Sequence, residues 1–147
     1  SGERDIERIY SIMTRAAELG ERRGNQVCGP SVAARMRMNQ YFVTHYPSEE
    51  AQQMIYQYTG TGLPSTESIP AAAALLLLAK GDPRRCAEFT ANIGGDTDTM
   101  GAMACGICGA LTGADVFPEE AQRLLSSVND IDFEALADML IRCAERI

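Results

Sequence analysis

Residues 92–113 read NIGGDTDTMGAMACGICGALTG, and the chemical character of this stretch changes partway along it. Two glycines and two Asp-Thr pairs come first, and almost every later residue is small or apolar. The later part predicts a helix over about 98–112, because small residues recur at the three- and four-residue steps of one helical face. These residues are Gly101, Cys105, Cys108, Gly109 and Thr112. An interior glycine costs a helix about 1 kcal/mol relative to alanine, so we expect close packing around this helix.

The rest of the chain is also predicted to be helical. Apolar residues recur with helical spacing, and no segment shows the two-residue alternation of a half-buried strand. Glycine, proline and hydroxyl residues make 59–68, TGTGLPSTES, the most loop-like segment. The sequence therefore predicts an all-α protein of about eight helices. The expected helices cover residues 3–23, 31–46, 48–60, 70–80, 83–93, 98–112, 118–128 and 133–146.

Several helix starts are predicted from the residue types found there. Ser48, Asp82 and Asp132 carry side-chain oxygens that can accept backbone N–H groups at the first turn of a helix. Pro70 is placed in the first turn of the apolar helix, where its missing N–H removes no helical hydrogen bond.

Composition restricts the classes of function. The chain of 147 residues is long enough for one domain or a large part of one. Its net charge of -7 argues against general nucleic-acid binding, which needs lysine and arginine to neutralise phosphates. The longest apolar run, residues 69–79, is shorter than the roughly 20 residues of a membrane span. We therefore expect the protein to bind neither nucleic acid nor a membrane.

The cysteines and the first ten residues indicate a cytoplasmic protein with reduced thiols. Five cysteines form no dense framework, and SGERDIERIY at the start has no secretory signal. Cys105 and Cys108 form a C-x-x-C pair on the small-residue helix, and we expect them to fill core space rather than serve redox or zinc chemistry. His45 is the only histidine and is expected to be a surface or packing residue. The predicted core also contains Met36, Met38, Tyr41 and Phe42.

The segment GGDTDT offers several hard oxygen donors within a short distance. Asp96, Asp98 and Thr99 suit Mg²⁺, Mn²⁺ or Ca²⁺ better than Zn²⁺, which prefers cysteine and histidine. Gly94 and Gly95 have no side chains, so backbone and ligand can approach closely. An alternative is that Asp96 or Thr97 only caps the following helix, which is the common role of such residues. The residues alone leave both interpretations open.

Three blocks of the chain resemble the C-terminal half of the ADP-ribosylglycohydrolase family, which includes the dinitrogenase-reductase-activating glycohydrolases. VCGPSVAARM resembles the family's V-x-G-x-S-[IV] helix entry, and GTGLPSTESIPAAAALLL resembles its G-[IF]-x-x-x-E-S-V-P-A-A block. NIGGDTDTMGAMACGICGALTG resembles its L-G-G-D-T-D-T signature and the small-residue helix that follows it. The last block is highly specific, and all three occur in the family's order.

This resemblance implies an all-α orthogonal multi-helix bundle with two Mg²⁺ or Mn²⁺ ions at its cleft. It implies that Asp96, Asp98 and Thr99 supply part of the metal shell, and that the loop with Thr61, Gly62 and Leu63 contacts ADP-ribose. Glu67 and Ser68 are expected to cap the apolar helix. The family's reaction is hydrolysis of the bond at ribose C1″ that joins ADP-ribose to a protein or a small molecule. A metal can orient ribose hydroxyls and activate water for such a reaction.

The chain departs from the family pattern in one respect. The family's N-terminal G-D-x-x-G and T-D-D-T segments, which complete the metal shell and carry much of the acid–base function, do not occur. We therefore expect residues 1–147 to be the C-terminal portion of one ADP-ribosylglycohydrolase-like domain. We expect no catalytic residue beyond the metal ligands, and activity only when the N-terminal portion is joined. The alternative is a non-catalytic helical module of the same fold that binds ADP-ribose or a partner.

Overall fold

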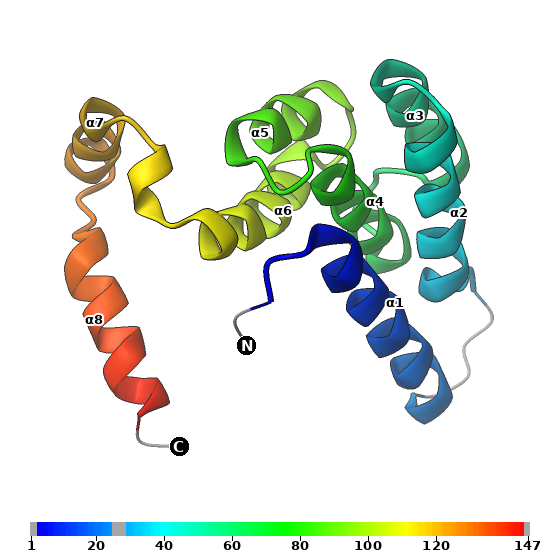
Figure 1. The fold of residues 1–147 in the computed structure, drawn as a ribbon, viewed down its shortest axis with the longest axis horizontal. Coiled ribbons are helices and arrows are strands. Elements are labelled where there is room, and N and C mark those ends of the chain that lie inside the picture. The colour runs from blue at the N-terminus through cyan, green and yellow to red at the C-terminus, as the bar shows by residue number, and fades with distance from the viewer. Residues whose placement is uncertain (1–2, 25–28, 146–147) are drawn as a thin grey trace. The chain divides into compact units, whose positions relative to one another are not determined.

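A computed structural model describes residues 3–24 and 29–145 (Figure 1). Helices account for every regular element in these ranges, with no strand among them, so the all-α prediction is confirmed. Their number also matches the expected eight α-helices, with one short π-helix and one 3₁₀ turn in addition. The elements are α1 (Ile6–Arg23), α2 (Val32–His45), α3 (Ser48–Met54), η1 (Ile55–Thr59), α4 (Ser65–Leu78), α5 (Pro83–Asn92), α6 (Thr97–Thr112), η2 (Ala114–Val116), α7 (Glu119–Asn129) and α8 (Phe133–Ala144).

The chain divides into two compact units, one ending at Thr112 and the other beginning at Gly113. We call them the N-terminal unit and the C-terminal unit. The C-terminal unit holds η2, α7 and α8, and the Gln122 amide donates to the backbone oxygens of Ala114 and Phe117. Among the residues that the structure describes, every buried side chain lies in the N-terminal unit, as does every predicted site residue. That residues 1–147 form a single domain portion stays a prediction.

Helix α4 forms the centre of the N-terminal unit and contacts both α2 and α6 (Figure 1). Every residue from Pro70 to Ala79 is buried. Leu75 and Leu76 are fully enclosed, and complete burial of such a side chain contributes roughly 2 kcal/mol. The same core includes Phe42, Ile55, Cys86, Met100, Ala104 and Cys108. This packing fixes the start of α4 relative to the start of α6.

Pro70 lies inside α4 rather than in its first turn, because the helix begins earlier, at Ser65. A proline has no N–H, so the usual bond to the carbonyl of Thr66 cannot form. The Arg35 guanidinium replaces it, with Nη1 donating to the Thr66 oxygen at 2.6 Å. Asn39 Nδ2 donates to the Pro70 oxygen at 3.0 Å, and Asn39 Oδ1 accepts from the Thr59 hydroxyl. Side chains of α2 therefore stabilise the first half of α4.

The capping predictions are confirmed at two of three positions. Asp82 accepts from the Arg85 N–H at 2.7 Å, and Asp132 accepts from the Ala135 N–H at 2.9 Å. The prediction for Ser48 is wrong, because Pro47 occupies the cap position of α3 and no side chain caps it. In the part of the chain that the structure describes, no helix is both long enough and apolar enough to cross a bilayer.

Candidate functional site

The turn before α6 has a backbone that only glycine adopts easily. Gly94 has φ +86° and Gly95 has φ +78°, in the left-handed region. A Cβ on Gly95 would lie 2.2 Å from the backbone oxygen of Thr61 and 2.4 Å from its hydroxyl oxygen. The turn therefore approaches the loop after η1 more closely than any side chain would allow.

A hydrogen bond joins that loop to the same turn. The Asp96 N–H donates to the Thr61 backbone oxygen at 2.7 Å. Thr61 is buried, with only 3% of its surface exposed. The loop expected to contact ADP-ribose thus lies directly against the turn expected to bind metal. The two segments are far apart in the sequence, and the packing of α4 on α6 brings them together.

Asp96 and Thr99 are also in contact. The Thr99 hydroxyl donates to Asp96 Oδ1 at 2.9 Å, and the Met100 N–H donates to the Asp96 backbone oxygen. Asp96 therefore stands at the N-terminal end of α6, where the helix dipole favours a negative charge. One of its carboxylate oxygens is held by a neighbouring hydroxyl, which fixes the orientation of the carboxylate.

Asp98 lies in the first turn of α6 and is exposed. Its carboxylate makes no hydrogen bond or ion pair with any residue that the structure describes, and no arginine there neutralises Asp96. Within residues 3–24 and 29–145, no three histidine, cysteine or acidic side chains gather closely enough to hold a metal ion. The metal assignment of Asp96, Asp98 and Thr99 stays a prediction.

Glu67 contacts the loop in a way that sequence reasoning missed. Its Oε2 accepts from the Gly62 N–H at 3.0 Å, while Leu63 at the loop tip is 83% exposed. The expectation that Glu67 and Ser68 cap α4 is wrong. Pro64 holds the cap position without a side-chain bond, and the Ser68 hydroxyl donates to the Pro64 oxygen inside the helix. An acidic residue shortly after a Gly-x-Gly loop was the available signal.

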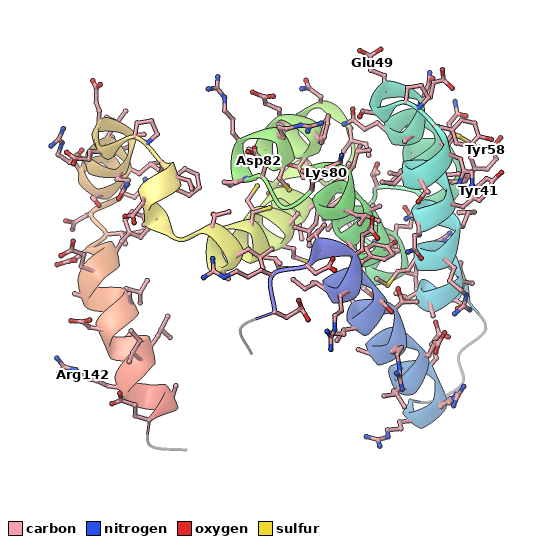
Figure 2. The ribbon with its side chains drawn as sticks, viewed as in Figure 1. Tyr41, Glu49, Tyr58, Lys80, Asp82 and Arg142 are labelled. Atoms are coloured by element: carbon pink, nitrogen blue, oxygen red, sulfur yellow. The ribbon has the colours of Figure 1, made fainter. Side chains whose placement is uncertain are left out.

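Aromatic side chains of α2 and η1 lie close together. Figure 2 shows Tyr41 and Tyr58 on the same side of the ribbon, and Phe42 lies within 6.5 Å of both ring centres. The prediction of Tyr41 as core is wrong, since it is 52% exposed and stacks on His45 at 4.1 Å. Tyr56 reaches the turn itself, because its ring would be 3.5 Å from a Cβ on Gly94. The other predicted core residues, Met36, Phe42 and the partly buried Met38, pack as expected.

The thiols of α5 and α6 meet in the core. Cys86 and Cys108 are fully buried and Cys105 is partly buried. Burial raises the pKa of Cys86, and the neighbouring Cys108 raises it further. Burial also raises the pKa of Cys108. Cys108 lies in the hydrophobic core and Cys105 packs against it, which agrees with the prediction that the C-x-x-C pair fills core space. That the pair serves no redox or zinc chemistry stays a prediction.

The family profile described as ADP-ribosylglycohydrolase matches residues 2–146. The chain belongs to the ADP-ribosylglycohydrolase family. It is 43% identical over 113 residues to the uncharacterized protein YegU of Escherichia coli (strain K12). The aligned part covers 76% of this chain and 34% of YegU, so the chain spans about a third of the length of this curated relative. No solved structure shows a match to this ADP-ribosylglycohydrolase chain.

Proposed function

We propose that this ADP-ribosylglycohydrolase chain is part of a metal-dependent hydrolase that removes ADP-ribose from a modified protein or a small molecule. The reaction is cleavage of the bond at ribose C1″ by water. The observation that carries the proposal is the hydrogen bond from the Asp96 N–H to the Thr61 oxygen. It supports a site in which a substrate loop and metal-binding acids lie side by side.

The donor set fits a hard divalent cation. Asp96, Asp98 and Thr99 offer only oxygen, which Mg²⁺ and Mn²⁺ prefer. The Asp98 carboxylate has no hydrogen-bond or ion-pair partner among the described residues. Asp96 Oδ1 accepts from the Thr99 hydroxyl, and Asp96 Oδ2 makes no hydrogen bond with a described residue. A metal at this site would orient ribose hydroxyls and lower the pKa of a bound water. The chain's own contribution is to hold the two carboxylates at the N-terminal end of α6 and the loop beside them.

We further propose that the N-terminal portion of the same enzyme supplies the remaining ligands. Two carboxylates and a hydroxyl are too few for the six ligands that Mg²⁺ needs, even with several waters, if two ions are bound. Helix α6 supports the idea of a covering partner. It buries Met100, Ala104 and Cys108, whereas no described atom outside their own helix lies within 4 Å of a Cβ placed on Gly106 or Gly109. A helix face made of glycine is suited to close approach by another helix.

The test compares Asp98→Asn with Asp138→Asn in the complete enzyme. Asp138 is an exposed aspartate on α8 and is not among the predicted site residues, so it controls for the loss of one negative charge. Asp98→Asn should lower the rate of ADP-ribose release at least about 100-fold and weaken Mn²⁺ binding measured by calorimetry. Asp138→Asn should change neither quantity.

The isolated 147-residue chain should bind Mn²⁺ poorly and release no ADP-ribose. Normal turnover by the chain alone would contradict the need for an N-terminal portion. Normal turnover by the Asp98→Asn enzyme would remove Asp98 from the site. A complete protein that binds ADP-ribose but never hydrolyses a modified substrate would be the non-catalytic module instead.

A further inference from the structure

The peptide group between Thr61 and Gly62 is held from both sides. Its N–H, on Gly62, donates to Glu67 Oε2 at 3.0 Å. Its oxygen, on Thr61, accepts from the Asp96 N–H at 2.7 Å. Both hydrogen bonds act on one rigid plane, because a peptide group does not twist about its C–N bond. The orientation of this plane therefore links α4 to the predicted metal turn.

We propose that Glu67 is a positioning residue that fixes this peptide plane and thereby the place of Asp96. The proposal rests on the proposed function, because it concerns the same site. Glu67 itself need touch neither substrate nor metal. It acts by keeping the Thr61 oxygen directed at the Asp96 N–H.

The loop is shaped around the Glu67 carboxylate. A Cβ on Gly60 would lie 2.5 Å from Oε2, and a Cβ on Gly62 would lie 2.9 Å from it. Gly60 also has φ +81°, which a residue with a side chain rarely adopts. The two glycines thus allow the backbone to close on the carboxylate, and Glu67 is partly buried there.

Hydrogen-bond acceptance by Glu67 keeps the peptide plane from turning over. A flipped plane would direct the Thr61 oxygen toward the carboxylate, where two acceptors would repel each other. In the observed orientation a Glu67 side-chain oxygen meets a donor instead, so the hydrogen bond favours this orientation over the flipped one. The flipped plane would also leave the Asp96 N–H without its acceptor, and Thr61 is buried, so water could not easily replace it.

The same geometry limits which loop groups can bind a substrate. The Gly62 N–H is engaged by Glu67 and so is not a free donor for a substrate phosphate. The loop would therefore contact its ligand through Leu63 and other groups at its exposed tip.

The experiment uses three variants in the complete enzyme: Glu67→Ala, Glu67→Gln and Glu67→Asp. Alanine removes the acceptor, glutamine keeps an acceptor oxygen at the same reach, and aspartate keeps the charge but is one methylene too short. Glu50→Ala is the matched control, because Glu50 lies in the first turn of α3 and is exposed. It reports on the loss of an acidic residue near a helix start without any contact to the loop.

Glu67→Ala and Glu67→Asp should raise the KM for substrate and the Kd for Mn²⁺ about tenfold, with a much smaller change in kcat. In Glu67→Gln and Glu50→Ala, the KM for substrate and the Kd for Mn²⁺ should stay within about threefold of the parent values. Amide hydrogen exchange by NMR should be faster at Gly62 and Asp96 in the alanine and aspartate variants alone.

Parent-like KM and parent-like exchange at Asp96 in Glu67→Ala would overturn the proposal. Equal impairment by glutamine and alanine would also overturn it, because charge rather than hydrogen-bond acceptance would then matter. If Glu67→Ala does not fold, fast exchange at Gly62 in the glutamine variant overturns the proposal and slow exchange supports it. Exchange is measured without substrate, so absent hydrolase activity in the parent would defeat the proposed function and leave this test valid.

Discussion

Gly95→Ala tests the close approach between the turn before α6 and the loop after η1. The residue has φ +78°, and the new Cβ would stand 2.2 Å from the Thr61 backbone oxygen. A Cβ and a non-bonded oxygen do not approach so closely, so the loop or the turn must move. The nearest atoms are backbone and the short Thr61 side chain, so no flexible side chain can simply swing away.

The expected cost follows from two contributions. A left-handed backbone costs a residue with a side chain roughly 1–2 kcal/mol relative to glycine. Displacing the loop also breaks the hydrogen bond from the Asp96 N–H to the Thr61 oxygen, which contributes about 1 kcal/mol. Gly95→Ala should therefore lower the free energy of unfolding by about 2–3 kcal/mol.

Urea unfolding of the complete enzyme measures this cost, with Gly20→Ala as the control. Gly20 lies within α1 and has no atom within 4 Å of its Cβ position. The same substitution there should stabilise the protein by roughly 0.5–1 kcal/mol, because alanine is the better helix former. A Gly95→Ala protein within about 0.5 kcal/mol of its parent would refute the close approach, since even the backbone term alone is larger.

Two further results are expected. Gly106→Ala should stabilise the isolated chain by up to about 1 kcal/mol, since its Cβ would meet open space. In the complete enzyme the same substitution should destabilise the protein, because the N-terminal portion would lie against this face of α6. Thermal unfolding measures both effects, and equal effects in the two proteins would contradict that placement of the N-terminal portion. The second result concerns pH: burial raises the pKa of Cys86 and Cys108, so the folded thiols stay protonated where unfolded ones ionise, near pH 8.5. The free energy of unfolding should be constant below that pH and fall above it, and the fall should be less steep in Cys86→Ala. Urea midpoints that do not change between about pH 8 and 9.5 would contradict the burial of these thiols.

Features encoded by neighbouring residues were predictable from the sequence. Asp82 and Asp132 cap their helices because a cap needs only a short polar side chain and the next few N–H groups. The small-residue helix and the turn before it were also placed correctly, since glycine and aspartate mark such a junction. The all-α fold followed from periodicity along the whole chain.

Features that depend on distant partners were not predictable in the same way. The start of α4 was placed too late, because Arg35 and Asn39 of α2 support a proline inside the helix. Tyr41 was assigned to the core from its apolar neighbours, but its face of α2 is exposed. Glu67 looked like a helix cap, and only the folded loop shows that it accepts from Gly62.

The proline inside α4 has a consequence for the order in which the molecule assembles. The segment after Pro70 keeps its internal helical hydrogen bonds, whereas the turn before it lacks one internal bond and depends on Arg35. Helix α2 is synthesised first, so it is already available when α4 emerges. The turn that carries Glu67 should become ordered only after α4 docks on α2. A half-folded chain would then carry helices before the loop between η1 and α4 has taken its shape.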